Sequence, residues 1–263
     1  MVGTEKCCVM GLLDEKVVVV TGGGHGIGRA YCLGIAREGG TAVVADIDSA
    51  AADGVAKAIA DRGGKALAVR VDVANAASCQ EMAKETLNIY GKIDGLVNNA
   101  AIFMSVPAEK GSFQTITEAE WDRIMAVNVK GLWLCARAVV PAMQQRKQGS
   151  IVNISSNMAF NGGQGMMHYV VSKAAVVGFS RVLARELGGD NIRVNTLAPG
   201  STMSEEEPTA EALKNYERTA STRILKRVEQ PEDLVGTALY LLSDLSSFVT
   251  GQVILVNGGA VLH

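Results

Sequence analysis

The chain has 263 residues, of which 48% are hydrophobic and 20% are charged, and it contains 29 glycines. Its 25 Lys and Arg residues nearly balance 27 Asp and Glu residues, so nucleic acid and anionic membranes are not favoured as partners. Five scattered cysteines and three histidines lack metal-ligand spacing, which predicts reduced thiols and no metal site. We expect a cytoplasmic protein, because the N-terminus has no signal-peptide pattern and no apolar run reaches the roughly 20 residues that span a bilayer.

Short apolar runs alternate with helical segments along the chain. Runs rich in β-branched residues predict strands at 16–21, 41–46, 65–73, 92–100, 149–156, 191–199 and 252–257. Helical patterns lie between them, at 30–40, 49–64, 76–90, 118–146, 169–187 and 231–243. Strands this apolar are buried on both faces, and the alternation predicts a parallel, doubly wound α/β sheet. Since no linker or repeat divides the chain, we expect a flexible tail over 1–11 and one domain over 12–263.

A glycine-rich turn, TGGGHGIGRA at 21–30, joins the first predicted strand to the first helix. Gly22, Gly26 and Gly28 would let the backbone turn sharply and approach a pyrophosphate, which the helix N-terminus would hold. Such a turn can also be a simple connection, but the strand before it and the helix after it favour dinucleotide binding. The spacing is G-x-x-x-G-x-G, which differs from the general G-x-G-x-x-G fingerprint.

Asp46 ends the second predicted strand, about 20 residues beyond the glycines, where an acid can accept hydrogen bonds from the adenosine ribose hydroxyls. Its charge would repel a 2′-phosphate, and neighbouring Ile47 supplies no compensating cation. His25 is mostly neutral at pH 7, since the reference pKa of histidine is about 6.5. The alternative for Asp46 is a solvated acid at a strand end. The position favours NAD over NADP.

Two further strand ends fit the same site. Asp72 and Val73 would lie beside the adenine, and Asn98–Ala100 beneath the ribose, because open α/β sheets bind ligands at the carboxyl ends of their strands. Farther along, HYVVSK at 168–173 places Tyr169 and Lys173 one helical turn apart, on one face. Taken alone, such a pair is more often an ordinary surface feature than a catalytic one.

Together these motifs resemble the short-chain dehydrogenase/reductase family. The resemblance runs from about residue 12 to the end, and the motifs that carry it are TGGGHGIG, the strand-end Asp72, NNAA (98–101), the N-V of MAVNVKG (125–131), NISS (153–156), YVVSK (169–173) and APG (198–200). It implies a Rossmann-type three-layer α/β/α sandwich with a seven-stranded parallel sheet. It also implies an active site within the same single domain, and commonly a homotetramer.

The resemblance implies a catalytic set of Asn128, Ser156, Tyr169 and Lys173. Tyr169 would be the acid/base, and Lys173 would activate it and reach the nicotinamide ribose. Ser156 would hydrogen-bond the substrate oxygen, and the family spacing of 13 residues before the tyrosine selects it over Ser155. Asn128 would hold a water that links Lys173 to solvent. The alternative for Asn128 is an asparagine that caps a kink in a helix interior. The alternative for Ser156 is an ordinary hydroxyl at a strand end.

Electrostatics gives an expectation for the Tyr169 hydroxyl. Lowering its pKa from the reference value of about 10 to roughly 7 requires about 4 kcal/mol. One ammonium about 4 Å away contributes on the order of 4 kcal/mol at an effective dielectric constant near 20. We therefore expect Lys173 to supply most of this change, with a further contribution from the positive nicotinamide of NAD.

The predicted cofactor contacts come from the glycine turn, the strand ends and the segment after the APG. They are Gly22, His25, Gly26, Ile27, Gly28, Asp46, Ile47, Asp72, Val73, Asn99, Ala100, Ala101, Tyr169, Lys173, Pro199, Gly200, Thr202 and Ser204. Ala101 stands where the family usually has glycine. Ser204 matches the family's threonine near the carboxamide, with Thr202 two positions before it, and VNGG replaces the common VDGG near the C-terminus.

The predicted substrate pocket is rich in methionine. Its residues are Ser156, Met158, Phe160, Met166, Tyr169 and Met203. Methionines are adaptable apolar fillers, so a medium-sized, largely apolar alcohol or ketone is expected, although several of these residues could instead pack the core. The polar segment 201–223 is expected to form a lid with a short helix. His168 could touch substrate, but an exposed histidine at the helix cap is the simpler expectation.

The leading hypothesis is an NAD-dependent oxidoreductase that transfers hydride between a secondary alcohol and NAD. Its expected partners are a small alcohol or ketone and further copies of itself. A 3-oxoacyl-[acyl-carrier-protein] reductase shares every motif, but normally uses NADPH, so Asp46 argues against it. The glycine spacing disfavours a nucleotide-sugar epimerase. A non-catalytic dinucleotide-binding regulator would usually lack the tyrosine or the lysine.

Overall fold

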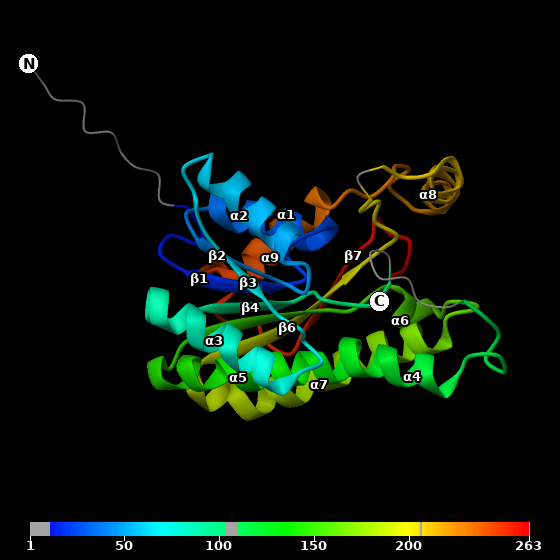
Figure 1. Cartoon of the computed structure of the whole chain (residues 1–263). Helices are drawn as coiled ribbons and strands as arrows, with labels where there is room; N and C mark the ends of the chain where they lie inside the picture. The colour runs from blue at the N-terminus through cyan, green and yellow to red at the C-terminus, as the bar shows by residue number, and fades with distance from the viewer. Residues whose placement is uncertain (1–10, 104–109, 206, 263) are drawn as a thin grey trace, which may run out of the picture.

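A single parallel sheet forms the centre of the protein, in a computed structural model that describes residues 11–103, 110–205 and 207–262. Its strand order is β3-β2-β1-β4-β5-β6-β7, which confirms the predicted seven-stranded parallel sheet (Figure 1). The strands are β1 (Val17–Thr21), β2 (Thr41–Asp46), β3 (Lys65–Arg70), β4 (Gly95–Asn98), β5 (Gly149–Ile154), β6 (Ile192–Pro199) and β7 (Val253–Val256).

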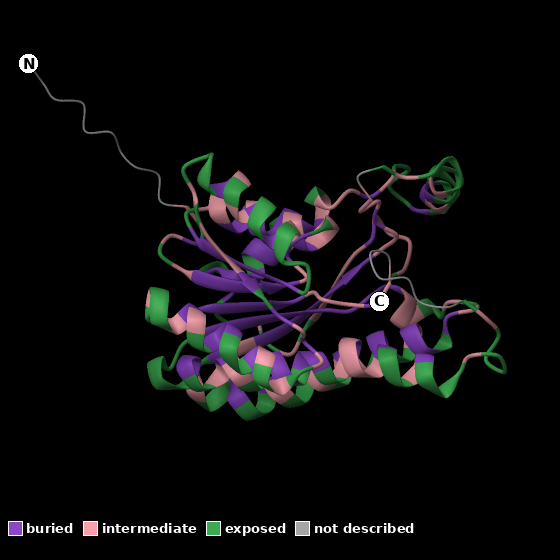
Figure 2. Cartoon of the chain, viewed as in Figure 1, coloured by how far each residue is buried: buried purple, intermediate pink, exposed green. Residues whose placement is uncertain are grey.

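Helices cover both faces of the sheet. They are α1 (Gly26–Arg37), α2 (Ser49–Ala60), α3 (Ala76–Tyr90), α4 (Glu118–Met125), α5 (Gly131–Arg146), α6 (Met158–Asn161), α7 (Met167–Leu187), α8 (Ala210–Thr222) and α9 (Glu232–Leu242). Successive strand side chains point to opposite faces. Val18 and Val20 accordingly pack with α1, α2 and α9, whereas Val17 and Val19 pack with α3, α5 and α7. The result is the expected Rossmann-type three-layer sandwich, with its buried residues in the sheet and on the inner helix faces (Figure 2).

The helical pattern predicted over 118–146 is three consecutive elements. A π-helical turn, η1 (Ala126–Lys130), separates α4 from α5. The whole stretch is long and apolar enough to cross a membrane by length and composition alone. A core helix passes the same test, and α5 buries Leu134, Cys135 and Val139 against the sheet. Its apolar character therefore has a structural explanation within this fold.

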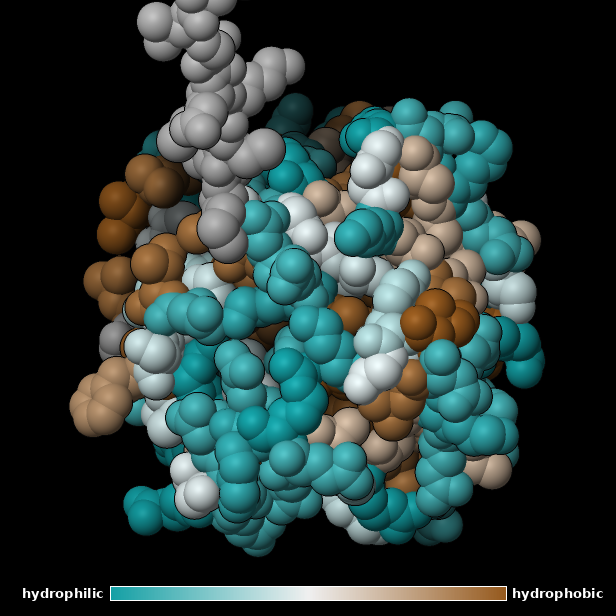
Figure 3. Space-filling model, turned by 90° about the vertical axis from the view of Figure 1, so that its left-hand side faces the viewer, coloured by the Kyte–Doolittle hydropathy of each residue, from teal (hydrophilic) through white to brown (hydrophobic). Residues whose placement is uncertain are grey.

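All strand carboxyl ends lie at one edge of the sheet, since the strands are parallel. Neighbouring β1 and β4 are followed by chains that turn to opposite faces, which makes the switch point where such sheets bind ligands. The helices α6 and α8 stand at this edge, on the right in Figure 1. At the opposite end of the molecule, hydrophilic residues cover much of the surface, with a group of hydrophobic residues on the left and smaller ones between the hydrophilic residues (Figure 3). The predicted tail, apart from Gly11, falls outside the described residues.

Candidate active site

A large cleft of about 1,520 Å³ opens at the carboxyl edge of the sheet. All eighteen residues predicted to contact the cofactor line it, from Gly22 in the first turn to Ser204 after β6. Ser156 and Met158 line it as well. The tertiary structure thus brings together segments that are separated by up to about 180 residues along the chain.

The first part of the cleft is built from the glycine turn. Gly22 and Gly26 have φ values of +64° and +47°, a conformation that other residues rarely adopt. A Cβ on Gly28 would lie 1.9 Å from the carbonyl oxygen of Gly22. The helix α1 begins at Gly26 without a side-chain cap from His25, and its first residues, Gly26, Ile27 and Gly28, line the cleft. This cradle has the space and the donors that a pyrophosphate requires.

Asp46 stands at the end of β2 with a fixed carboxylate. Its Oδ2 accepts a hydrogen bond of 2.8 Å from the Gly24 N–H, and its Oδ1 accepts one of 3.0 Å from the Asp48 N–H. Each oxygen keeps a second lone pair that can accept from a ribose hydroxyl. The adjoining lining residues are Ile47 and Asp48, and the imidazole of His25 lies 3.4 Å from Asp48. Among the described lining residues, the lysines and arginines come from other elements: Lys110, Lys173 and Arg218.

Tyr169 and Ser156 form the chemical centre of the cleft. Both are buried, and the Tyr169 ring stacks on Phe103 with ring centroids 4.5 Å apart. Burial raises the pKa of Tyr169 to about 12, and a hydrogen bond with the Ser156 hydroxyl acts in the opposite direction. The hydroxyl is therefore protonated at neutral pH. Phe103 was missed by sequence reasoning, because it belongs to no motif and lies 66 residues before the tyrosine.

Lys173 lies one turn beyond Tyr169, on the same helix α7. Its Nζ donates a hydrogen bond of 2.9 Å to the carbonyl oxygen of Ile154 and lies 5.9 Å from the Tyr169 ring centroid. Burial lowers the pKa of Lys173 to about 8. Desolvation of the Tyr169 phenol is the first cause of its raised pKa. The expectation that Lys173, together with the positive nicotinamide of NAD, lowers this pKa toward 7 stays a prediction.

Two other polar groups hold the catalytic helix in place. The Ser155 hydroxyl donates to the carbonyl oxygen of Lys173 at 2.7 Å, so it anchors α7 to β5, while Ser156 faces the tyrosine. Asn128 is fully buried in η1, and its Oδ1 accepts from the Ile102 N–H at 2.8 Å. Its Nδ2 donates to the Ser172 hydroxyl at 3.1 Å. Asn128 is absent from the described cleft lining, so its role in holding a water stays a prediction.

Three of the residues predicted to bind substrate do not line the cleft. Met166 is buried at the start of α7, Phe160 is half-buried on α6, and the Met203 N–H donates to the Glu229 carbonyl oxygen. The predicted lid does contain a helix, α8, and six of its residues line the cleft. These missed residues are Glu211, Ala212, Asn215, Tyr216, Arg218 and Thr219. Sequence gave no signal for them beyond the polar composition of the segment.

His168 differs from expectation. It is fully buried, so the prediction of an exposed histidine at the helix cap is wrong. Its Nε2 lies 3.8 Å from a carboxylate oxygen of Glu120 on α4. The chain folds α4 over the start of α7, which no local pattern around residue 168 could indicate.

The fold and the cleft define an enzyme of the nicotinamide-dependent oxidoreductase class. Residues 22–261 match a family model described as enoyl-(acyl carrier protein) reductase, and the chain belongs to the short-chain dehydrogenase/reductase family.

Its relatives are similar over nearly their whole length. A 3-oxoacyl-[acyl-carrier-protein] reductase from Thermotoga maritima is 39% identical, over 95% of this chain and 99% of the relative. A (2S)-[(R)-hydroxy(phenyl)methyl]succinyl-CoA dehydrogenase subunit from Thauera aromatica is 37% identical, over 95% and 98%. An uncharacterized oxidoreductase from Mycobacterium tuberculosis is 42% identical, over 96% and 100%.

Proposed function

We propose that the protein is an NAD(H)-dependent oxidoreductase that interconverts a hydroxyl and a keto group, with 3-oxoacyl thioesters as its substrate class. The observation that carries the chemistry is the buried Tyr169 beside Ser156, at the end of a cleft whose other end holds Asp46. Support for the thioester comes from the relatives, whose names denote a 3-oxoacyl carrier-protein substrate and a hydroxylated acyl-CoA. The plain alcohol or ketone expected from sequence is the second candidate.

The residues can perform the proton transfer that accompanies hydride transfer. A nicotinamide cofactor, when bound, supplies or accepts the hydride. The Ser156 hydroxyl would hold the substrate oxygen, and the Tyr169 hydroxyl would donate its proton to that oxygen as the ketone is reduced. Because burial keeps Tyr169 protonated, the cleft is prepared for reduction at neutral pH. Lys173 would stabilise negative charge on the phenolate that remains.

Asp46 supports NAD(H), and this part of the proposal is tested by binding. We expect NADH to bind at least 10-fold more tightly than NADPH, since the 2′-phosphate would meet a carboxylate already fixed by two N–H groups. Asp46→Ala should reduce this ratio to near one. Asp53→Ala, which removes an exposed charge on α2 outside the cleft, is the matched control. Equal affinities of the wild type in a fluorescence titration would refute the assignment of NAD(H).

Substrate class is tested by turnover. Purified protein with NADH should reduce acetoacetyl-CoA and 3-oxoacyl carrier-protein thioesters with a higher kcat/KM than simple ketones of the same chain length. Turnover of simple ketones or secondary alcohols alone would refute the thioester as substrate class, while the oxidoreductase activity would stand. Tight NADH binding without turnover of any of these would favour the regulatory alternative.

A further inference from the structure

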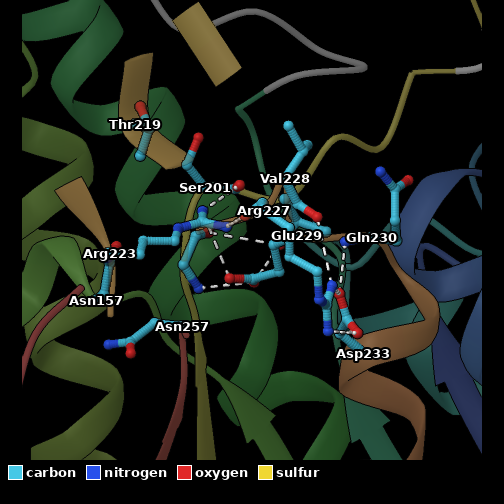
Figure 4. A network of polar contacts seen from close by, with 12 residues as sticks. Asn157, Ser201, Thr219, Arg223, Arg227, Val228, Glu229, Gln230, Asp233 and Asn257 are labelled. Atoms are coloured by element: carbon cyan, nitrogen blue, oxygen red, sulfur yellow. Dashed lines mark hydrogen bonds and ion pairs between the residues drawn. The ribbon is translucent and has the colours of Figure 1, made fainter. Parts of the chain in front are cut away.

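A buried ion pair lies beneath the lid, outside the catalytic cluster. Arg223 and Glu229 are only 2% and 4% exposed, and the Arg223 Nη2 lies 3.5 Å from the Glu229 Oε2. The two residues belong to the segment that follows α8, and they reach back to the segment that precedes it (Figure 4). We call this pair the hinge clasp, since it joins the two connections between α8 and the rest of the domain.

Glu229 binds three successive parts of the first connection. Its Oε1 accepts from the Thr202 hydroxyl at 2.7 Å and from the Gly200 N–H at 3.0 Å. Its backbone carbonyl accepts from the Met203 N–H at 2.9 Å, and Thr202 and Glu229 form a parallel β-bridge. One residue after the lid thereby fixes both the backbone and a side chain of the segment before it.

Arg223 completes the connection from the other side. Its Nη2 donates to the Ser201 carbonyl oxygen at 2.6 Å, and its Nη1 donates to the Arg227 carbonyl oxygen at 3.3 Å. The Leu225 N–H donates to the Gly258 carbonyl oxygen at 2.9 Å, which ties this segment to the chain after β7. The clasp is therefore anchored to the end of the sheet.

Stability alone does not account for the clasp. Within the described part of the chain, the Arg223 Nε and the Glu229 Oε2 have no hydrogen-bond partner, so the pair is incompletely satisfied. Burial raises the pKa of Glu229 from its ordinary value. A buried ion pair of this kind is often no better for stability than apolar residues of the same volume. Its directional contacts, all made to residues 200–203 and 227, point to a role in geometry.

We propose that Glu229 and Arg223 are positioning residues that fix Gly200–Ser204 to receive the nicotinamide carboxamide, an inference that rests on the proposed function. Gly200, Thr202 and Ser204 line the cleft, whereas neither member of the clasp does. Because the Thr202 hydroxyl gives its proton to Glu229, its oxygen can only accept a hydrogen bond from a ligand. The amide NH₂ of a carboxamide is such a donor.

The test compares NADH with its 3-acetylpyridine analogue, in which a methyl group replaces the amide NH₂. The double variant Arg223→Met/Glu229→Leu removes both charges and keeps the volume, and its folding is checked by circular dichroism. In this variant we expect the Kd of the 3-acetylpyridine analogue divided by the Kd of NADH to fall at least fivefold. We also expect the KM for NADH to rise. The preference for NADH over NADPH, set by Asp46 at the other end, should not change. Glu229→Gln keeps an acceptor oxygen for Thr202 and should retain most of the ratio.

The matched control is Arg227→Met/Asp233→Leu, which removes the neighbouring, more exposed ion pair (2.5 Å) without touching Thr202. It should leave the ratio unchanged. A folded Arg223→Met/Glu229→Leu variant with the wild-type ratio and KM would overturn the role of the clasp. If that variant does not fold, Thr202→Val decides, since it has the same shape and cannot donate to Glu229; a wild-type ratio there also overturns the inference. A wild type that binds neither NADH nor NADPH would instead overturn the proposed function.

Discussion

Tyr169 and Lys173 have pKa values that move in opposite directions, and burial is the first cause of both changes. The tyrosine is raised to about 12 and the lysine is lowered to about 8. In each case the dry environment disfavours the charged form. At neutral pH the cleft thus holds a protonated phenol and a mostly protonated Lys173, which loses its proton at a lower pH than an ordinary lysine.

The reaction should depend on pH differently in its two directions. Reduction needs the protonated Tyr169, so its rate should be nearly constant from about pH 6 to about pH 7.5. Oxidation needs the phenolate, whose fraction rises about 10-fold per pH unit below the pKa, so its rate should rise with pH. Initial rates at saturating cofactor measure both directions. Tyr169→Phe should bind NADH and lose at least about 100-fold in both. An oxidation rate independent of pH would contradict this assignment.

Lys173 should lower the stability of the fold. A change in pKa from the ordinary 10.5 to about 8 corresponds to about 3 kcal/mol at 1.36 kcal/mol per pKa unit. The folded state disfavours the ammonium, so this destabilisation is complete below about pH 8 and disappears as the pH rises toward 10.5. Lys173→Met should therefore raise the free energy of unfolding by about 1–3 kcal/mol at pH 7, less the lost bond to Ile154, and abolish turnover. Urea unfolding at pH 7 and at about pH 10 measures both; an equal gain at the two values would contradict the titration argument.

The π-helical turn η1 connects elements that sequence reasoning treats separately. Through Asn128 it holds the chain after β4 at Ile102 and the catalytic helix α7 at Ser172, whose hydroxyl donates to the Tyr169 carbonyl oxygen at 2.7 Å. Single π turns are common at functional sites. Here the turn places the Asn128 side chain between Ile102, after β4, and Ser172 on α7, and Asn128 bonds both.

Asn128→Ala should destabilise the protein by about 1–3 kcal/mol, because it leaves the buried Ile102 N–H without its partner. Turnover should fall as well, since the start of α7 loses a support. Ser172→Ala keeps the bond between Asn128 and Ile102 and should cost less. Chemical denaturation and steady-state kinetics measure the two effects. A larger loss of stability in Ser172→Ala would show that the Ile102 contact is not the important one.

Two separate apolar surfaces lie outside the cleft. Trp133 on α5 and Val182 on α7 are 46% and 56% exposed, while Leu245 and Phe248 before the edge strand β7 are 68% and 102% exposed. The edge strand of a sheet and exposed large apolar side chains are features that assembly often covers. Two distinct self-complementary faces on one chain can generate a closed tetramer with dihedral symmetry. The homotetramer stays a prediction, now with candidate interfaces.

Light scattering should give a mass of four chains. Trp133→Glu and Phe248→Glu should each reduce it to two chains, since each places a charge in only one of the interfaces. Lys57→Glu, an exposed charge reversal on α2, is the control that should leave the mass unchanged. A monomeric wild type would contradict the prediction.

Local sequence determined the parts of this protein that depend on local geometry. The period of apolar residues predicts the strands and helices, and parallel strands necessarily bring Gly22, Asp46 and Ser156 to one edge. The spacing of Tyr169 and Lys173 places both on one helix face. The direction of the pKa change in Tyr169, the burial of His168 and the pairing of Arg223 with Glu229 could not be predicted in this way. Each depends on desolvation and contacts supplied by distant segments, and these exist only once the chain has folded around them.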